Sequence, residues 1–128
     1  MCHCGCGPLT AAKIVGETAG IDRFKSPDEY ARNNGTAPLP VWSSNRARDR
    51  LGRTGNRQLK AAFHRIALTQ VHWHPLAQAM IARRRGNGDG GLEPLRVLKR
   101  RLSDVVYRAL REDATVGKAA TLNLAEAA

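Results

Sequence analysis

Aromatic side chains are scarce in this 128-residue sequence, at 5% of the residues, and long apolar runs are missing. Few aromatic residues argue against a pocket for a bulky ligand and favour small aliphatic contacts between helices. No apolar stretch approaches the roughly 18 residues of a membrane span. The first residues also lack the charged region and apolar run of a secretory signal. The sequence therefore predicts a single cytoplasmic domain with no membrane partner.

Cysteine is confined to three crowded positions, Cys2, Cys4 and Cys6. An odd number of closely spaced cysteines favours a reducing compartment over a disulfide framework. Structural zinc sites generally place roughly two to four residues between paired ligands and add a second pair further along. This sequence has neither feature, and its acidic residues are dispersed. We therefore expect no metal site and no cofactor in this chain.

Positive charge is in clear excess, with 21 lysines and arginines against 11 acidic residues and a formal net charge of +10. Such a surplus points to a polyanionic partner, of which nucleic acid is the commonest. The composition thus favours a nucleic-acid-binding protein.

Hydrophobic periodicity and capping residues predict a mainly α fold. Helices are expected over residues 8–20, 27–32, 57–73, 75–85 and 92–112. The third helix should bury Leu59, Ala62, Phe63, Ile66 and Trp73. The last should bury Leu95, Leu98, Leu102, Val105, Val106 and Ala109. Residues 39–42 are compatible with one short extended piece.

Composition shifts divide the chain into three parts. We expect an atypical start over residues 1–4, a helical domain over 5–112 and a disordered tail over 113–128.

The opening Gly5-Cys6-Gly7-Pro8 precedes the first expected helix. Two glycines permit a tight turn that aims backbone N–H groups outward, where Gly5, Gly7 and Thr10 would contact a phosphate. Helix-hairpin-helix elements grip the DNA backbone in this way. The alternative is an ordinary glycine turn that leads into a helix.

A strongly basic loop precedes the long third helix, with Asp49 as its single acidic residue. Each cation that neutralises a phosphate releases counterions, so this loop would supply salt-sensitive affinity that is independent of base sequence. The candidate contacts, which include the helix-capping Asn56, are Arg46, Arg48, Arg50, Arg53, Asn56, Arg57 and Lys60. The alternative is a solvated loop. The clusters at 83–85 and 99–101, and His64, are interpreted as solvated helix faces, although the two clusters could extend the same footprint.

Ser43 and Ser44 stand immediately before the basic loop, after a stretch stiffened by two prolines. A serine hydroxyl becomes a nucleophile only with the help of a base, a metal or a field of cations. Serines in polar loops usually form turns. Composition alone therefore favours the turn-forming role over catalysis.

Three ordered blocks together resemble the C-terminal transposase domain of the IS-one-ten group of insertion-sequence transposases. They are GCGPLTAAKIVGETAG, FKSPDEYARNNGTAPLPVWSSN and RLGRTGNRQLKAAFHRIALTQ, and the resemblance runs from about Gly5 to Arg111. The resemblance implies a bacterial DNA recombinase in which a serine of this domain attacks a DNA phosphate. It also implies a structured guide RNA and an N-terminal RNase-H-like domain whose four acids bind magnesium.

The family's serine usually precedes a glycine, and Trp42-Ser43-Ser44-Asn45 places Ser43 in the serine position and Ser44 in the glycine position. The resemblance thus implies Ser43 as the catalytic residue, with Ser44 as the rival. Because the chain starts at the glycine hairpin and lacks the magnesium-binding domain, we expect a truncated transposase fragment that is inactive alone. Its exposed apolar surface would favour a homo-oligomer. The alternative is a non-catalytic module that binds DNA or RNA.

Overall fold

A computed structural model describes residues 5–37 and 55–127, with side chains described as far as residue 119. The helices in these stretches are α1 (Pro8–Thr18), the short 3-10 helix η1 (Ile21–Arg23), α2 (Pro27–Asn34), α4 (Arg57–Trp73), α5 (Pro75–Gly86) and α6 (Glu93–Ala127). No strand occurs within the described stretches, and the predicted mainly α class is confirmed. The extended piece expected at 39–42 lies outside the described residues.

Local sequence signals explain where the helices begin. Proline occupies the first helical position of α1, α2 and α5, where its missing N–H costs no hydrogen bond. At α2 the Ser26 hydroxyl accepts a hydrogen bond from the backbone N–H of Glu29 (3.2 Å). The Glu29 carboxylate in turn accepts from the N–H of Lys25 (2.8 Å). These two hydrogen bonds fix the start of α2, with Ser26 as its N-cap.

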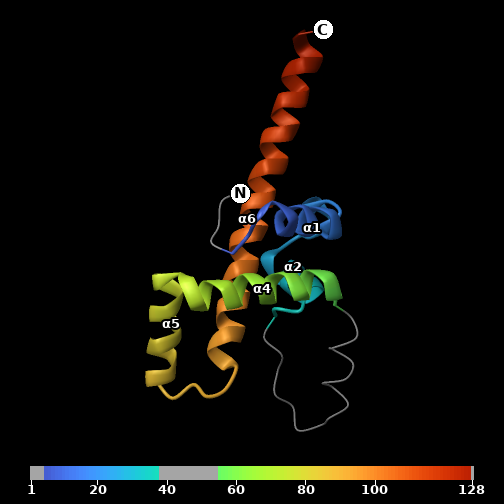
Figure 1. The fold of residues 1–128 in the computed structure, drawn as a ribbon. Coiled ribbons are helices and arrows are strands. Elements are labelled where there is room, and N and C mark those ends of the chain that lie inside the picture. Colours follow the sequence, from blue (N-terminus) through green and yellow to red (C-terminus); the bar gives the residue numbers. More distant parts are fainter. Residues whose placement is uncertain (1–4, 38–54, 128) are drawn as a thin grey trace.

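The core forms where α4 crosses α6, with α1 and α2 near one end of α4 and α5 at the other, and with η1 packed against α6 (Figure 1). Tyr30, Leu59 and Phe63 are fully buried there. The rings of Phe24 and Phe63 both pack edge-on against Tyr30, with centroids 5.2 and 6.3 Å away. Both phenylalanines and both tyrosines of the sequence are thus gathered in one cluster, because the Tyr107 ring also lies 6.0 Å from that of Tyr30.

Trp73 corrects one prediction about α4. The expected apolar face is buried at Leu59, Ala62, Phe63 and Ile66, but Trp73 is 78% exposed. Trp73 is the last residue of α4, and the chain turns at His74 directly into α5. Its ring therefore lies past the part of α4 that the other helices cover.

Helix α6 packs against α5, α4, α2 and η1. It continues to Ala127, past the end near Glu112 that its apolar stripe predicts (Figure 1). Beyond Glu112, Lys118 donates a hydrogen bond to the Asp22 carboxylate beside η1 (2.9 Å). Leu98, Leu102 and Val106 are buried as predicted, whereas Leu95, Val105 and Ala109 are half-buried. Tyr107 and Leu110, which the predicted stripe omitted, are buried instead. The predicted domain boundaries stay predictions.

Candidate nucleic-acid interface

Asn56 joins three helices immediately before α4. Its Oδ1 accepts hydrogen bonds from the backbone N–H groups of Gln58 (2.9 Å) and Leu59 (3.1 Å), which confirms the predicted N-cap. Its Nδ2 donates to the Glu17 carboxylate on α1 (3.0 Å), and its backbone N–H donates to the Asn33 carbonyl on α2 (2.6 Å). The Asn56 amide is therefore engaged within the fold, and its predicted nucleic-acid contact stays a prediction.

The residues on either side of segment 38–54 lie next to each other at the C-terminal end of α2. On one side, the Thr36 backbone N–H donates to the Ala31 carbonyl (3.0 Å). On the other, Gly55 is packed so closely that a Cβ there would lie 3.3 Å from the Asn33 carbonyl oxygen. Ala37 and Gly55, the described residues that flank segment 38–54, therefore both lie at the C-terminal end of α2.

Six of the predicted site residues belong to segment 38–54 and lie outside the described residues. They are Ser43, Ser44, Arg46, Arg48, Arg50 and Arg53.

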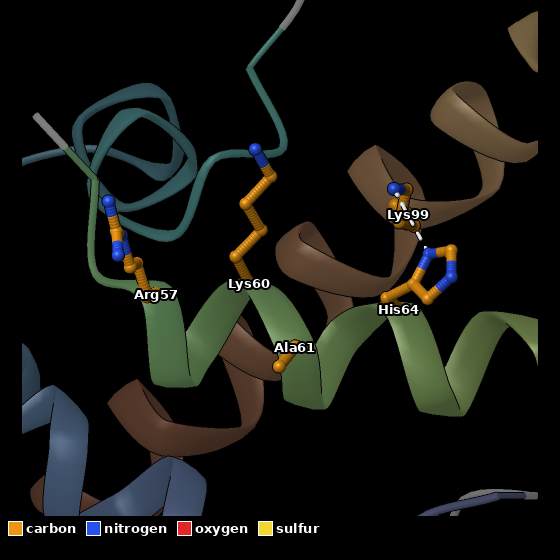
Figure 2. Close-up of a pocket in the computed structure, with 5 residues that line it drawn as sticks. All are labelled: Arg57, Lys60, Ala61, His64 and Lys99. Atoms are coloured by element: carbon orange, nitrogen blue, oxygen red, sulfur yellow. Dashed lines mark hydrogen bonds between the residues drawn. The ribbon is translucent and has the colours of Figure 1, made fainter. Parts of the chain in front are cut away.

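A small open pocket of about 330 Å³ lies between α4 and α6. Arg57, Lys60, Ala61 and His64 line it from α4, and Lys99 lines it from α6 (Figure 2). The fold thus brings two predicted cations, Arg57 and Lys60, together with His64 and Lys99, which the sequence analysis interpreted as parts of solvated helix faces. In the described part of the chain, none of these basic residues forms an ion pair with a carboxylate.

The Lys99 ammonium occupies a strongly positive environment. Its Nζ lies 3.4 Å from His64 Nδ1. Partial burial lowers the pKa of Lys99 below its ordinary value, and the positive charges of Lys60 and Arg96 lower it further. No helical periodicity could have revealed the contact between His64 and Lys99, because 35 residues separate them.

The three basic residues of the cluster at 99–101 have different surroundings. Lys99 lines the pocket. Arg100 pairs with the carboxylates of Asp28 on α2 and Asp104 on α6, so it holds α2 against α6. Arg101 is exposed. Only Lys99 extends the predicted basic footprint into the pocket.

The glycine hairpin packs against the middle of α4. Gly5 has a φ of +85°, and a Cβ there would lie 3.0 Å from both the Ile66 carbonyl oxygen and Thr69 Cβ. A glycine is required at this position because only it adopts such a φ without strain and fits so close to α4. The structure therefore gives Gly5 a packing role that the sequence analysis did not foresee.

Gly7 is the N-cap of α1 and is exposed, with no atom within 4 Å of where its Cβ would be. It offers no side chain to the first N–H groups of the helix, which have no carbonyl partner within α1. Thr10, in the first turn, is half-buried. This geometry is compatible with the predicted phosphate contact at Gly7 and Thr10, which stays a prediction.

The hairpin and the pocket lie on different faces of α4. Ile66 and Thr69, which contact Gly5, lie roughly 120–180° around the helix from Lys60 and His64 at 3.6 residues per turn. The fold therefore keeps the two predicted phosphate-binding regions apart.

The described residues gather no metal ligands. Within residues 5–37 and 55–127, no three His, Cys, Asp or Glu side chains are placed to hold one ion. Burial raises the pKa of the Cys6 thiol, which disfavours the thiolate form that binds zinc. The magnesium that the family resemblance implies thus has no site among the described residues, and no metal step is assigned to them.

A small helical domain that exposes a group of cations beside an arginine-rich segment is typical of a nucleic-acid-binding protein. This chain belongs to the Transposase IS116/IS110/IS902 family, whose model matches residues 1–82, more than half of its 128 residues. The match includes every predicted site residue from Gly5 to Lys60. No curated protein and no solved structure gives a significant match. Within the described stretches, no helix has both the length and the apolar character of a membrane span.

Proposed function

We propose that this transposase-family chain binds the sugar-phosphate backbone of DNA through Arg57, Lys60 and the arginines before them. We propose further that Ser43 is the nucleophile of DNA strand exchange when the chain acts with a magnesium-binding domain.

The observation that carries the DNA-binding proposal is the position of Arg57 and Lys60. Both lie in the first turn of α4, only a few residues after segment 38–54 in the sequence. The arginines of that segment are therefore tethered beside two cations that no described carboxylate neutralises. Unneutralised cations grouped in this way attract phosphates and release condensed counterions.

The serine proposal is supported by the family and by the motif. Residues 1–82 match the family model, and the motif Trp42-Ser43-Ser44-Asn45 favours Ser43 as the attacking serine, with Ser44 as its rival. In such a step the serine Oγ forms a bond to phosphorus and loses its proton to a base. The ester bond to one DNA strand breaks, and the departing strand oxygen takes up a proton. Neighbouring arginines would stabilise the developing negative charge.

We propose that exposed apolar side chains on α1 and at the junction of α4 and α5 support association with a second copy or with another domain. Leu9, Trp73 and Leu76 are 89%, 78% and 76% exposed. Light scattering after size-exclusion chromatography tests self-association, and a monomer at every concentration would contradict it. A guide RNA is proposed from the family resemblance alone.

The test of DNA binding is a salt titration of affinity for labelled duplexes of several unrelated sequences. The variant replaces three arginines of the segment with glutamine, namely Arg46, Arg48 and Arg50. We expect the slope of log affinity against log salt to fall by about one for each lost phosphate contact, similarly for all sequences.

The matched control removes the same charge elsewhere. It replaces Arg83, Arg85 and Arg101, which are exposed and form no ion pair within the described residues, with glutamine. The control should keep a steeper slope than the segment variant. Equal slopes for both variants would show that net charge alone matters, and absence of binding to DNA and RNA at low salt would refute the proposal outright.

A further inference from the structure

The pocket between α4 and α6 combines cations from parts of the chain that are far apart in sequence. Lys60 follows the arginine-rich segment, whereas Lys99 comes from α6, beyond the residues 1–82 that match the family model. Lys99 therefore lies outside the family match, and the sequence offered it only as part of a cluster that could extend the basic footprint, without assigning it to this pocket. Figure 2 shows the side chains of Lys60, His64 and Lys99 along the same opening.

The position of Lys60 is set by the end of α2. Its side-chain carbons pack against Gly35, where a Cβ would lie 3.1 Å from Lys60 Cδ. Gly35 is the C-cap of α2 with a φ of +76°, a conformation that glycine adopts without strain. The methylene groups of Lys60 thus lie along the α2 cap, which leaves the ammonium at the end of the side chain for a ligand.

The position of Lys99 is set by His64. The ammonium donates to His64 Nδ1 at 3.4 Å. A lysine ammonium has three N–H donors, so two remain for a ligand. Because Lys99 is half-buried, its side chain is also more restricted than that of a fully solvated lysine.

Two like charges held together in this way are unfavourable without an anion. Lys60 and Arg96 are the charged groups that lower the Lys99 pKa, and both are cations. The nearby Arg100 already pairs with Asp28 and Asp104, so those carboxylates do not offset the charge of Lys99. A phosphate bound between the two lysines would relieve the repulsion and partly replace the lost hydration.

We propose that Lys60 and Lys99 together hold one phosphate of the nucleic-acid backbone in the pocket between α4 and α6. The inference rests on the proposed function and deepens it, since it adds a contact from α6 to a surface otherwise built from α4 and the arginine-rich segment. Arg57 lines the same pocket and supports a neighbouring phosphate.

The experiment compares Lys99→Gln with Arg101→Gln in the full chain. The two residues lie on the same helix, and each substitution removes one positive charge, but Arg101 is exposed and outside the pocket. Circular dichroism and urea unfolding establish that both variants are folded. Affinity for a labelled duplex and for a single-stranded RNA is then measured across a salt series.

We expect Lys99→Gln to weaken binding by roughly three- to tenfold and to lower the salt slope by about one. Arg101→Gln should leave the slope unchanged, and Lys99→Arg should largely restore the affinity. Equal losses of affinity for Lys99→Gln and Arg101→Gln would refute the proposed phosphate contact in the pocket and would favour a diffuse attraction between the positively charged chain and the nucleic acid.

The same measurements distinguish a failure of the pocket proposal from a failure of the proposed DNA binding. If Lys99→Gln binds like the wild type while the triple arginine variant is weakened, the pocket proposal falls and DNA binding by the segment stands. If the wild-type chain itself fails to bind, both fall together.

Discussion

A buried asparagine, Asn34, links the end of α2 to α6 and to Thr36 through hydrogen bonds. Asn34 is fully buried, and its Nδ2 donates to the Ser103 hydroxyl on α6 (2.9 Å). Its Oδ1 accepts from both the backbone N–H (3.1 Å) and the hydroxyl (2.6 Å) of Thr36. Asn34→Ala removes all of these bonds and leaves buried polar groups on Thr36 and Ser103 without their partner. At about 1 kcal/mol for each net hydrogen bond, the free energy of unfolding should fall by roughly 3 kcal/mol.

The neighbouring asparagine supplies the control. Asn33 Nδ2 is buried without a hydrogen-bond partner in the described structure, so Asn33→Ala should cost less than about 1 kcal/mol. The two variants change the same residue type on adjacent positions of α2, so their helix propensities change equally. Urea unfolding followed by far-UV circular dichroism measures both, and the slope should be unchanged if only stability has altered. Equal midpoints for the two variants would refute the reasoning that the Asn34 network stabilises the fold.

Two further predictions concern Lys99 and the serines. Lys99→Met should stabilise the fold at about pH 7, because partial burial and the charges of Lys60 and Arg96 disfavour the charged form of Lys99 in the folded state. Solvent screens the repulsion between Lys99 and these exposed cations, so the gain should be no more than roughly 0.5 kcal/mol. Because the Lys99 pKa is lowered from its ordinary value of 10.5, this gain should shrink as the pH rises through the lowered pKa towards that value, and a gain in urea midpoint independent of pH would contradict it. In a chimera with an RNase-H-like domain, Ser43→Ala should abolish the covalent protein–DNA adduct on a denaturing gel and Ser44→Ala should not. Adducts in both single variants would exclude Ser43 as the required nucleophile, whereas absence of an adduct in the wild-type chimera would favour the non-catalytic binding module.

The helices were predictable because their signals are local. Proline at the first helical position, Ser26 as a cap and the spacing of Leu59, Phe63 and Ile66 each act within a few residues. These signals located the starts of α2 and α4 and the buried face of α4. The burial of Trp73 was predicted wrongly, because periodicity shows which face of a helix is apolar but not how much of that face the neighbouring helices cover.

The candidate site was less predictable because it depends on packing between distant residues. The one-sided charge of the segment was visible in sequence, but the meeting of His64 with Lys99 depends on how α4 crosses α6. The requirement for glycine at Gly5 depends equally on the approach of Ile66 and Thr69. The sequence pattern predicts a tight turn with outward-facing N–H groups at this glycine, whereas the structure shows a close contact with α4.

The separation of the hairpin from the pocket makes the hairpin testable by itself. Gly7 is an exposed N-cap with a φ of −76° and a ψ of 175°, so Gly7→Asp and Gly7→Ser both fit without strain. Each side chain would cap α1 and raise stability by a few tenths of a kcal/mol. Only the aspartate also adds a negative charge where a phosphate would bind.

We therefore expect Gly7→Asp to weaken DNA binding relative to Gly7→Ser, although it is equally stable or more so. Because the hairpin and the pocket lie on different faces of α4, this loss should add to that of Lys99→Gln without coupling. Identical affinities for the two Gly7 variants would show that the hairpin serves only to enter α1 and to pack against α4. A loss that vanishes in the Lys99→Gln background would require both regions to contact the same phosphate, and it would therefore contradict their separation on different faces of α4.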